Sequence, residues 1–313
     1  MPSAPACAFL QLCLSIRAQS EQQENERMSF ENSVVWITGA SSGIGEALAR
    51  ELLQQGAKII LSGRRADALQ AVAAVDPQRT LVLPFESTDY DAIDGLVEQA
   101  WNWQGHVDCL INNAGISQRS LALDTQFDVY RKLIEVDYLA PVALTQAILP
   151  RMVERRSGQL AVISSVAGKI GTALRTGYCG AKHAVVGYFE ALRAEVERAH
   201  GISVSVILPG SVRTGVAVNA LSGDGHSRGR SDVNIENGMP ADEAARRILA
   251  GMAAGDRTIE IAEGTELSAM RLRVSDPEKL FSLMAGEGAR LARQRAESGS
   301  ADIDPGAVKR LDA

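Results

Sequence analysis

A strand, a glycine-rich turn and a helix follow one another in the first part of the chain. Residues 34–37 are an apolar run of β-favouring residues, and residues 46–53 have the apolar spacing of a helix that ends near Gly56. The turn between them reads Thr-Gly-Ala-Ser-Ser-Gly-Ile-Gly over residues 38–45. Its glycines would let a pyrophosphate reach backbone N–H groups at the positive end of the helix dipole. Because the spacing is G-x-x-x-G-x-G and not G-x-G-x-x-G, a purely structural turn is the alternative interpretation of this segment alone.

Apolar β-favouring runs alternate with helix-period segments along most of the chain. The clearest helices are expected at 127–151 and 178–200, the latter closed by Gly201. Alternation of this kind predicts an α/β fold with one doubly wound parallel sheet of Rossmann type and right-handed crossovers. A chain of 313 residues with 46% hydrophobic residues can build such a sheet as a single domain. After the first strand, the expected strands are 58–62, 80–85, 109–113, 159–164 and 203–208, with 257–262 as a seventh.

Two further motifs carry chemistry. Asn112-Asn113-Ala114-Gly115 follows the expected fourth strand, and Ser165 lies thirteen residues before Tyr178, which is itself four residues before Lys182. A tyrosine and a lysine four residues apart share one face of a helix. An ammonium roughly 4 Å from a phenol of pKa about 10 would lower that pKa by about three units at an effective dielectric of about 20. The tyrosine could then exchange protons near neutrality, while Ser165 donates to an oxygen that gains negative charge.

The order and spacing of these motifs resemble the short-chain dehydrogenase/reductase family over residues 33–214, and more weakly to 252. The resemblance implies an NADP(H)-dependent oxidoreductase that acts on a carbonyl or secondary alcohol, in which Tyr178 is the acid/base, Lys182 lowers its pKa and Ser165 polarises the carbonyl. The segment around 178–189 is most similar to reductases of ketones, steroids and related lipophilic carbonyls, and a homodimer or homotetramer is expected. The resemblance implies these cofactor-binding residues: Gly39, Ser41, Ser42, Gly43, Ile44, Gly45, Arg64, Glu86, Ser87, Asn113, Ala114, Gly115, Tyr178, Lys182, Pro209, Gly210, Val212 and Thr214.

The residues after the expected second strand favour NADP(H). An NAD-preferring Rossmann site carries an acidic residue about twenty residues beyond the glycine turn, where it binds the ribose 2′-hydroxyl. Here that position is Gly63, and Arg64 follows. A guanidinium makes charge-assisted bonds to a 2′-phosphate, although a merely solvated Arg64 is the alternative. Glu86 stands where the family usually has an Asp near the adenine.

Asp137 departs from the family pattern. The family has an Asn at this position, which the resemblance implies to anchor a water in a proton relay to the lysine, and we count Asp137 among the candidate catalytic residues. An ionised Asp137 about 8 Å from Tyr178 would raise the phenol pKa by about one unit and move the working pH upward, whereas a protonated one would not. Asp137 also supports the alternative of a non-catalytic NADP(H)-binding regulator or scaffold with a relict site. A lyase or epimerase that uses the cofactor transiently is a further alternative.

Composition limits the remaining functions. A formal net charge of -6 provides no basic stripe for nucleic acid. Neither the cysteines nor the histidines have metal-ligand spacing, and no metal is expected. The cysteine pattern favours a reducing, cytoplasmic setting for Cys7, Cys13, Cys109 and Cys179.

The ends of the chain are expected to lie outside the catalytic domain, which we predict over 31–296. Residues 1–30 are predicted to be a disordered extension, with Met28 as a possible true start; an organelle-targeting or peripheral membrane role is the alternative. The apolar stretch 6–16 is too short to span a bilayer, so no stable membrane span is expected. Residues 297–313 are predicted to be a disordered polar tail. Between these ends, 218–240 is expected to be a flexible loop or a substrate lid, and 276–293 an amphipathic helix.

Overall fold

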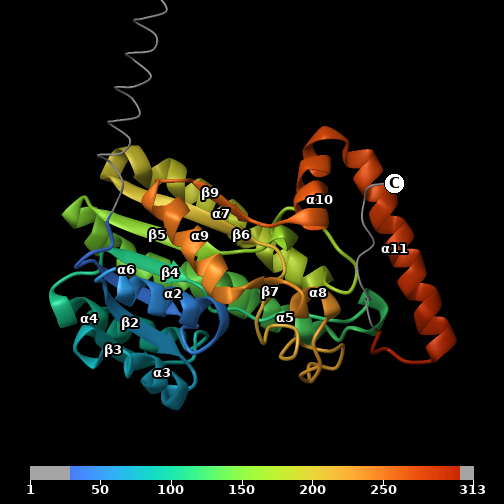
Figure 1. Ribbon diagram of the computed structural model, residues 1–313, viewed down its shortest axis with the longest axis horizontal. Coiled ribbons are helices and arrows are strands. Elements are labelled where there is room, and N and C mark those ends of the chain that lie inside the picture. The colour runs from blue at the N-terminus through green and yellow to red at the C-terminus, as the bar shows by residue number, and fades with distance from the viewer. Residues whose placement is uncertain (1–28, 304–313) are drawn as a thin grey trace, which may run out of the picture.

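The computed structural model describes residues 29–303 and has a parallel sheet at its centre (Figure 1). The sheet has seven strands in the order β3-β2-β1-β4-β5-β6-β9, and every neighbouring pair is parallel. This confirms the predicted doubly wound α/β fold. The strands are β1 (Val34–Thr38), β2 (Lys58–Gly63), β3 (Thr80–Pro84), β4 (Cys109–Asn112), β5 (Gly158–Ile163), β6 (Ile202–Pro209) and β9 (Thr258–Ile261).

Helices cover both faces of the sheet. On one face lie α2 (Gly43–Gln54), α3 (Ala66–Ala73) and α9 (Ala241–Ala253), and on the other α4 (Ile93–Gln104), α6 (Ala140–Arg155) and α7 (Thr176–His200). The elements outside these layers are α5 (Phe127–Ile134), the π-helical turn η4 (Glu135–Leu139), β7 (Val212–Arg213), α8 (Val233–Glu236), β8 (Met239–Pro240), α10 (Gly264–Ser275) and α11 (Pro277–Ser298).

The strands are apolar on both faces because both faces are covered. In β1, Val34 and Trp36 pack with α4, α6 and α7, while Val35 and Ile37 pack with α2, α3 and α9. Successive residues of a strand point to opposite faces, so one run of apolar residues contributes side chains to the cores on both sides of the sheet. The polar Nε1 of Trp36 is satisfied inside the first core, where it donates to Ser62 Oγ at 2.8 Å.

The helix predicted at 127–151 differs from the observed one in two ways. It runs to Arg155, and it contains the π-helical turn η4 between α5 and α6. Single π turns inside helices are frequent at functional sites. By length and composition alone, the continuous helix Phe127–Arg155 could also cross a membrane, although a core helix has the same property, and α6 here contacts α4, α7 and β5.

Both predicted domain limits differ from the structure at their inner ends. Phe30, expected in the extension, is buried with the core cluster of α2 and β2. At the other end, α11 continues to Ser298, and Ile303 is buried against Leu174 and Leu291. An isolated apolar residue in a polar segment gives no periodic signal, which is why the sequence did not indicate either contact. The expectations for residues 1–28 and 304–313 lie outside the described residues.

The C-terminal helices α10 and α11 extend beyond the sheet layers (Figure 1). The amphipathic helix predicted at 276–293 is α11, which Asp276 caps by accepting from Lys279 N at 3.0 Å. Arg295 of α11 pairs with Asp124 in the loop before α5. The C-terminal helix therefore packs against loops at the end of the sheet where the strands finish.

Segment 218–240 is anchored by a buried ion cluster. Asp232 accepts from Arg119 Nε at 2.6 Å and pairs with Arg228, and all three side chains are almost completely buried. Arg228 also pairs with Asp302, which follows α11, and its Nε lies 3.2 Å from Asp302 Oδ1. Charges buried with paired partners hold a segment in one geometry, and this geometry supplies one wall of the cavity described next.

Candidate active site

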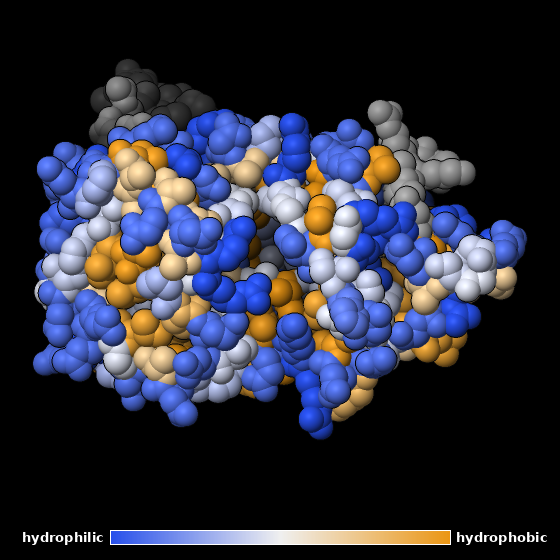
Figure 2. All heavy atoms as spheres, turned by 90° about the horizontal axis from the view of Figure 1, so that it is seen from below, coloured by the Kyte–Doolittle hydropathy of each residue, from blue (hydrophilic) through white to orange (hydrophobic). Residues whose placement is uncertain are grey.

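A cavity of about 900 Å³ opens at the carboxyl ends of the strands, the usual ligand position in a doubly wound sheet. The face seen from below in Figure 2 is hollowed near its middle, between hydrophilic borders and a more hydrophobic lower side. With two exceptions, every site residue predicted from the sequence lines this cavity. The exceptions are Gly45, which lies beneath the glycine turn, and Asp137, which is buried behind Gly115.

The glycine turn has the shape of an anion cradle. Gly39 and Gly43 have φ angles of +65° and +61°, a backbone region that favours glycine. A Cβ on Gly45 would lie 2.4 Å from Asn113 Nδ2, so only glycine allows the turn to approach β4. The cap residue of α2, Ser42, makes no side-chain hydrogen bond to the first turn of that helix. N–H groups at the positive end of α2 therefore face the cavity as an anion site.

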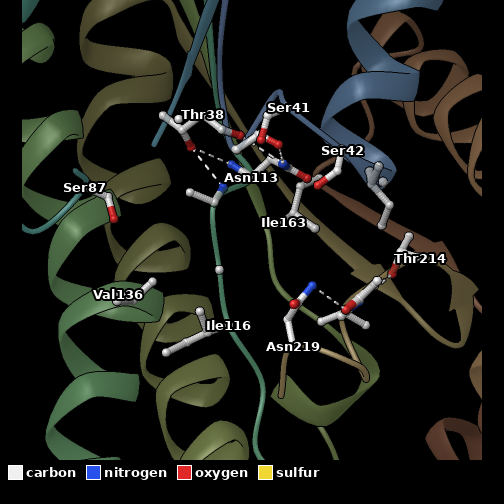
Figure 3. Close-up of a pocket in the computed structure, with 18 of the residues that line it drawn as sticks. Thr38, Ser41, Ser42, Ser87, Asn113, Ile116, Val136, Ile163, Thr214 and Asn219 are labelled. Atoms are coloured by element: carbon white, nitrogen blue, oxygen red, sulfur yellow. Dashed lines mark hydrogen bonds between the residues drawn. The ribbon is translucent and has the colours of Figure 1, made fainter. Parts of the chain in front are cut away.

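Thr38, which we did not predict, joins the glycine turn to the asparagine motif. Its Oγ1 accepts from the backbone N–H groups of Asn113 and Ala114, both at 3.0 Å, and Asn113 Nδ2 donates to Thr38 O at 2.9 Å. Figure 3 shows these two side chains facing each other beside Ser41 and Ser42. The sequence did offer a signal for this role, because Thr38 places a hydroxyl at the end of the first strand, directly before the glycine turn.

Two arginines lie at the outer end of the cavity, beside β2. Arg64 is largely exposed, and its nearest carboxylate is Glu86 at 3.8 Å, while Ser87 Oγ donates to the same Glu86 at 3.3 Å. Arg65, which the sequence analysis did not single out, donates to Ser41 O at 3.2 Å and to Ser41 Oγ at 3.1 Å. Both guanidinium groups therefore lie where a phosphate next to the glycine turn could be bound.

The structure brings Ser165, Tyr178 and Lys182 together at the inner end. Lys182 is buried on α7, its Nζ donates to Ile163 O at 3.1 Å, and it lies 5.7 Å from the centre of the Tyr178 ring. Ser165 follows β5 and its Oγ accepts from Ala167 N at 3.1 Å and donates to Pro209 O at 3.3 Å. A cation close to a phenol stabilises the phenolate, and the serine hydroxyl is available for a reacting oxygen.

Asp137 lies next to this group and is completely buried. It belongs to η4, accepts from Ile116 N at 2.8 Å through Oδ1, and the same oxygen is 3.9 Å from Lys182 Nζ. Its Oδ2 has no hydrogen-bond partner among residues 29–303. Burial raises the pKa of Asp137 to about 6, against the lowering effects of Lys182 and of the Ile116 N–H. Gly115 leaves room for the carboxylate, because a Cβ there would be 2.9 Å from Oδ1.

The remaining wall carries both apolar and polar side chains, Lys132 and Glu135 among them, and comes from segments far apart in the sequence. Figure 3 shows Ile116 and Val136 on one side of the cavity and Thr214 and Asn219 on another. The sequence analysis predicted segment 218–240 as a loop or substrate lid without naming its individual lining residues, and it did not single out Val216. The lining residues beyond Thr214 include Val216, Asn219, Leu221, Ser227 and Ile235. Within residues 29–303, no group of three His, Cys, Asp or Glu side chains has metal-site geometry.

Sequence comparison gives a family match that covers more than half of the chain. Residues 33–224 match the family model described as short chain dehydrogenase. Dehydrogenase/reductase SDR family member 7B of Bos taurus is 39% identical over 268 residues, which cover 83% of this chain and 82% of that protein. Dehydrogenase/reductase SDR family member 7 of Homo sapiens is 39% identical over 237 residues, which cover 74% of this chain and 70% of that protein.

Solved structures show the same fold with either cofactor. A short-chain dehydrogenase/reductase from Burkholderia phymatum, in complex with NAD, superposes with a TM-score of 0.71 at 21% identity and covers 80% of this chain and 96% of its own. A short-chain dehydrogenase from Burkholderia cenocepacia, in complex with NADP, gives a TM-score of 0.69 at 21% identity, with 82% and 99% covered. At this identity the likeness concerns the fold alone, and the two neighbours differ in their cofactor.

Proposed function

This chain belongs to the short-chain dehydrogenase/reductase family, and we propose that it is an NADP(H)-dependent oxidoreductase that interconverts a lipophilic carbonyl compound and its secondary alcohol. The observation that carries this proposal is the meeting of Ser165, Tyr178 and Lys182 in the cavity that the glycine turn borders. A proton donor, a cation and a hydroxyl at one end of a nucleotide-sized cleft suit hydride transfer to a carbonyl group.

The residues around the cavity fit a nicotinamide dinucleotide. A Cβ on Gly39 would lie 2.8 Å from Ala114 Cα, so the turn is open only because glycine occupies it. The N-terminus of α2 would hold the pyrophosphate, and Arg64 with Arg65 the phosphate on the ribose. Asn113 and Gly115 would border the middle of the cofactor, and the segment from Pro209 to Thr214 its nicotinamide end. When bound, the cofactor carries the hydride.

The protein's own part in the reaction is proton transfer and charge stabilisation. In the reductive direction, Tyr178 gives its phenolic proton to the carbonyl oxygen as that oxygen gains charge, and Ser165 Oγ donates to the same oxygen. Lys182 stabilises the phenolate that Tyr178 becomes. In the oxidative direction, the phenolate removes the proton of the alcohol. Ser165 would exchange its 3.3 Å bond to Pro209 O for a bond to the substrate.

The apolar wall supports a lipophilic substrate. Ile116, Val136, Leu221 and Ile235 line the cavity, with Asn219 and Ser227 as neutral polar groups and Lys132 and Glu135 as charged ones. The apolar part of this surface gains from burying hydrocarbon. A panel of ketones, aldehydes and diketones with NADPH, followed by absorbance loss of the cofactor, tests the proposal. Turnover restricted to small charged carbonyls, or no turnover of any member, would contradict it.

Asp137 favours one alternative, a non-catalytic NADP(H)-binding regulator. Its buried Oδ2 without a partner and its place beside Lys182 set it apart from the family's Asn. A regulator would bind NADPH with an ordinary dissociation constant but turn over no member of the panel. An enzyme would bind NADPH and also turn over at least one member. The expected homodimer or homotetramer and the expected cytoplasmic location stay predictions.

Arg64→Ala is expected to weaken NADPH binding by about tenfold or more and to leave NADH binding nearly unchanged, because one charge-assisted phosphate contact contributes roughly 1.5 to 3 kcal/mol. Arg64 is exposed and its carboxylate neighbour Glu86 is 3.8 Å away, so the guanidinium is free to turn to a phosphate. Cofactor titrations by fluorescence provide the measurement. Arg79→Ala, at an arginine outside the cavity lining, is the control. Equal dissociation constants for NADPH and NADH in the unmutated protein would refute the preference.

A further inference from the structure

Gln118 is a completely buried glutamine whose side chain uses all its hydrogen-bonding capacity. Its Oε1 accepts from the backbone N–H of Gly177 at 2.9 Å and of Tyr178 at 3.4 Å. Its Nε2 donates to Ser120 Oγ at 3.0 Å and to Thr125 Oγ1 at 3.1 Å. This arrangement fixes the amide orientation, because the opposite one would set an NH₂ group against two N–H donors.

The two N–H groups that donate to Gln118 Oε1 belong to the first turn of α7, the helix that carries Tyr178 and Lys182. The first N–H groups of a helix have no partner within it, and a cap residue usually supplies one. Arg175 at the cap position of α7 makes no side-chain hydrogen bond to the turn. Gln118, almost sixty residues earlier in the chain, supplies the side-chain oxygen that caps this turn.

Gly177 makes this contact possible. A Cβ at Gly177 would lie 3.1 Å from Gln118 Oε1 and 2.8 Å from side-chain atoms of Leu133 and Tyr130. Any larger residue would push the first turn of α7 away from the amide. The glycine directly before the reactive tyrosine therefore admits a cap from another part of the chain.

Gln118 also lies between α7 and the substrate wall. The backbone on both sides of it pairs with Leu221, since Leu221 N donates to Ser117 O and Arg119 N donates to Leu221 O, each at 2.8 Å. Leu221 lines the cavity together with Tyr178. One short segment, 117–119, thus contacts both the turn that carries Tyr178 and the loop that carries Leu221, and these two residues belong to one apolar cluster beside the cavity.

We propose that Gln118 is a positioning residue that holds the first turn of α7, and with it the phenol of Tyr178, in register with Lys182, Ser165 and the substrate wall at Leu221. The proposal rests on the proposed function for its kinetic consequences. Gln118 touches no reacting atom and acts through the position of Tyr178. Displacement of a reacting group by about 1 Å can lower the rate 10²-fold.

Gln118→Met tests this, because methionine has a similar volume and accepts poorly. We expect kcat with NADPH and the fastest ketone of the panel to fall by about 10- to 100-fold, while KM for NADPH changes less than about threefold. The matched control is Gln159→Met, at a glutamine equally buried on β5, whose Nε2 bonds to Met252 O at 3.3 Å. This control should lower the melting temperature without a comparable loss of kcat.

Gln118→Glu provides the rescue, because a carboxylate oxygen still accepts from both N–H groups of α7. It should recover most of the kcat that Gln118→Met loses. Equal kcat in Gln118→Met and the Gln159→Met control, or no recovery with glutamate, would overturn the proposal. Should Gln118→Met fail to fold, Gln118→Asn decides instead: it keeps the amide but withdraws the oxygen by one carbon, so kcat should fall, and an unchanged kcat would overturn the proposal.

A second readout needs no substrate and separates this proposal from the proposed function. Hydrogen exchange of the backbone N–H groups of Gly177 and Tyr178 reports whether the first turn of α7 is held in place. Gln118→Met should speed this exchange, because it removes the oxygen that accepts from both groups, whereas Gln159→Met should not. Faster exchange in a protein that turns over no panel member would sustain the positioning role while the proposed function fails. Unchanged exchange would refute the positioning role.

Discussion

Tyr178→Phe is expected to lower kcat by about 10³-fold or more and to leave the dissociation constant for NADPH within about twofold. Phenylalanine keeps the ring that faces Lys182, whose Nζ lies 5.7 Å from the ring centre, and removes only the oxygen that carries the proton. Without that oxygen, water must supply the proton, and the advantage of a positioned acid/base is lost.

The control for this substitution is Tyr188→Phe on the same helix. Tyr188 is half-buried, packs against Tyr138 and lies outside the cavity lining. Steady-state kinetics and cofactor titrations on both variants decide the matter. If Tyr178→Phe retains more than a tenth of kcat while Tyr188→Phe has the kcat of the unmutated protein, then Tyr178 is not the acid/base of the reaction.

Asp137→Asn is expected to make the protein's stability less dependent on pH. The pKa of Asp137 is raised from an ordinary 3.8 to about 6, first because burial disfavours the charged form. A carboxyl group with a raised folded-state pKa contributes stability below its unfolded pKa and loses that contribution as the pH rises through its folded pKa. The window is therefore pH 4 to 6, and the loss by pH 8 is about 3 kcal/mol in the free energy of unfolding.

Denaturant unfolding at pH 4 and pH 8 measures this effect. The asparagine variant should gain about 3 kcal/mol relative to the unmutated protein between the two pH values, because it has no proton to lose. Asp67→Asn, at an exposed carboxylate on α3, is the control. If the difference in the free energy of unfolding between Asp137→Asn and the unmutated protein is the same at pH 4 and pH 8, then Asp137 has the same pKa in the folded and unfolded states.

The same variant has a kinetic consequence in the oxidative direction. Asp137 Oδ1 lies 3.9 Å from Lys182 Nζ, so the ionised carboxylate partly cancels the positive field of that ammonium at the reacting oxygen. Asp137→Asn should lower the midpoint of the oxidative pH–rate profile by about one unit. Coincident midpoints would exclude an ionised Asp137 from the environment of Tyr178.

The sequence by itself determined the fold class and the approximate positions of the strands, because these depend on local periodicity. A buried strand such as β1 is apolar at every position, and a helix such as α7 ends at a glycine that adopts a φ of +70°. The spacing of Tyr178 and Lys182 likewise needs only the helix repeat to place both on one face. The glycine turn and the asparagine motif follow neighbouring strands and therefore meet at one edge of the sheet.

Only the tertiary structure decided the features that depend on contacts between distant segments. Gln118 is an ordinary polar residue in the sequence, and it becomes a cap only because the fold brings α7 to it. Asp232 and Ile303 lie in polar stretches, and each is buried with a partner more than a hundred residues away, Arg119 for Asp232 and Leu174 for Ile303. Local patterns report the period of an element, whereas desolvation and pairing depend on which elements meet. For the same reason the sequence identified Asp137 as unusual, but its pKa was set by the buried space among Ile116, Gly115 and Lys182.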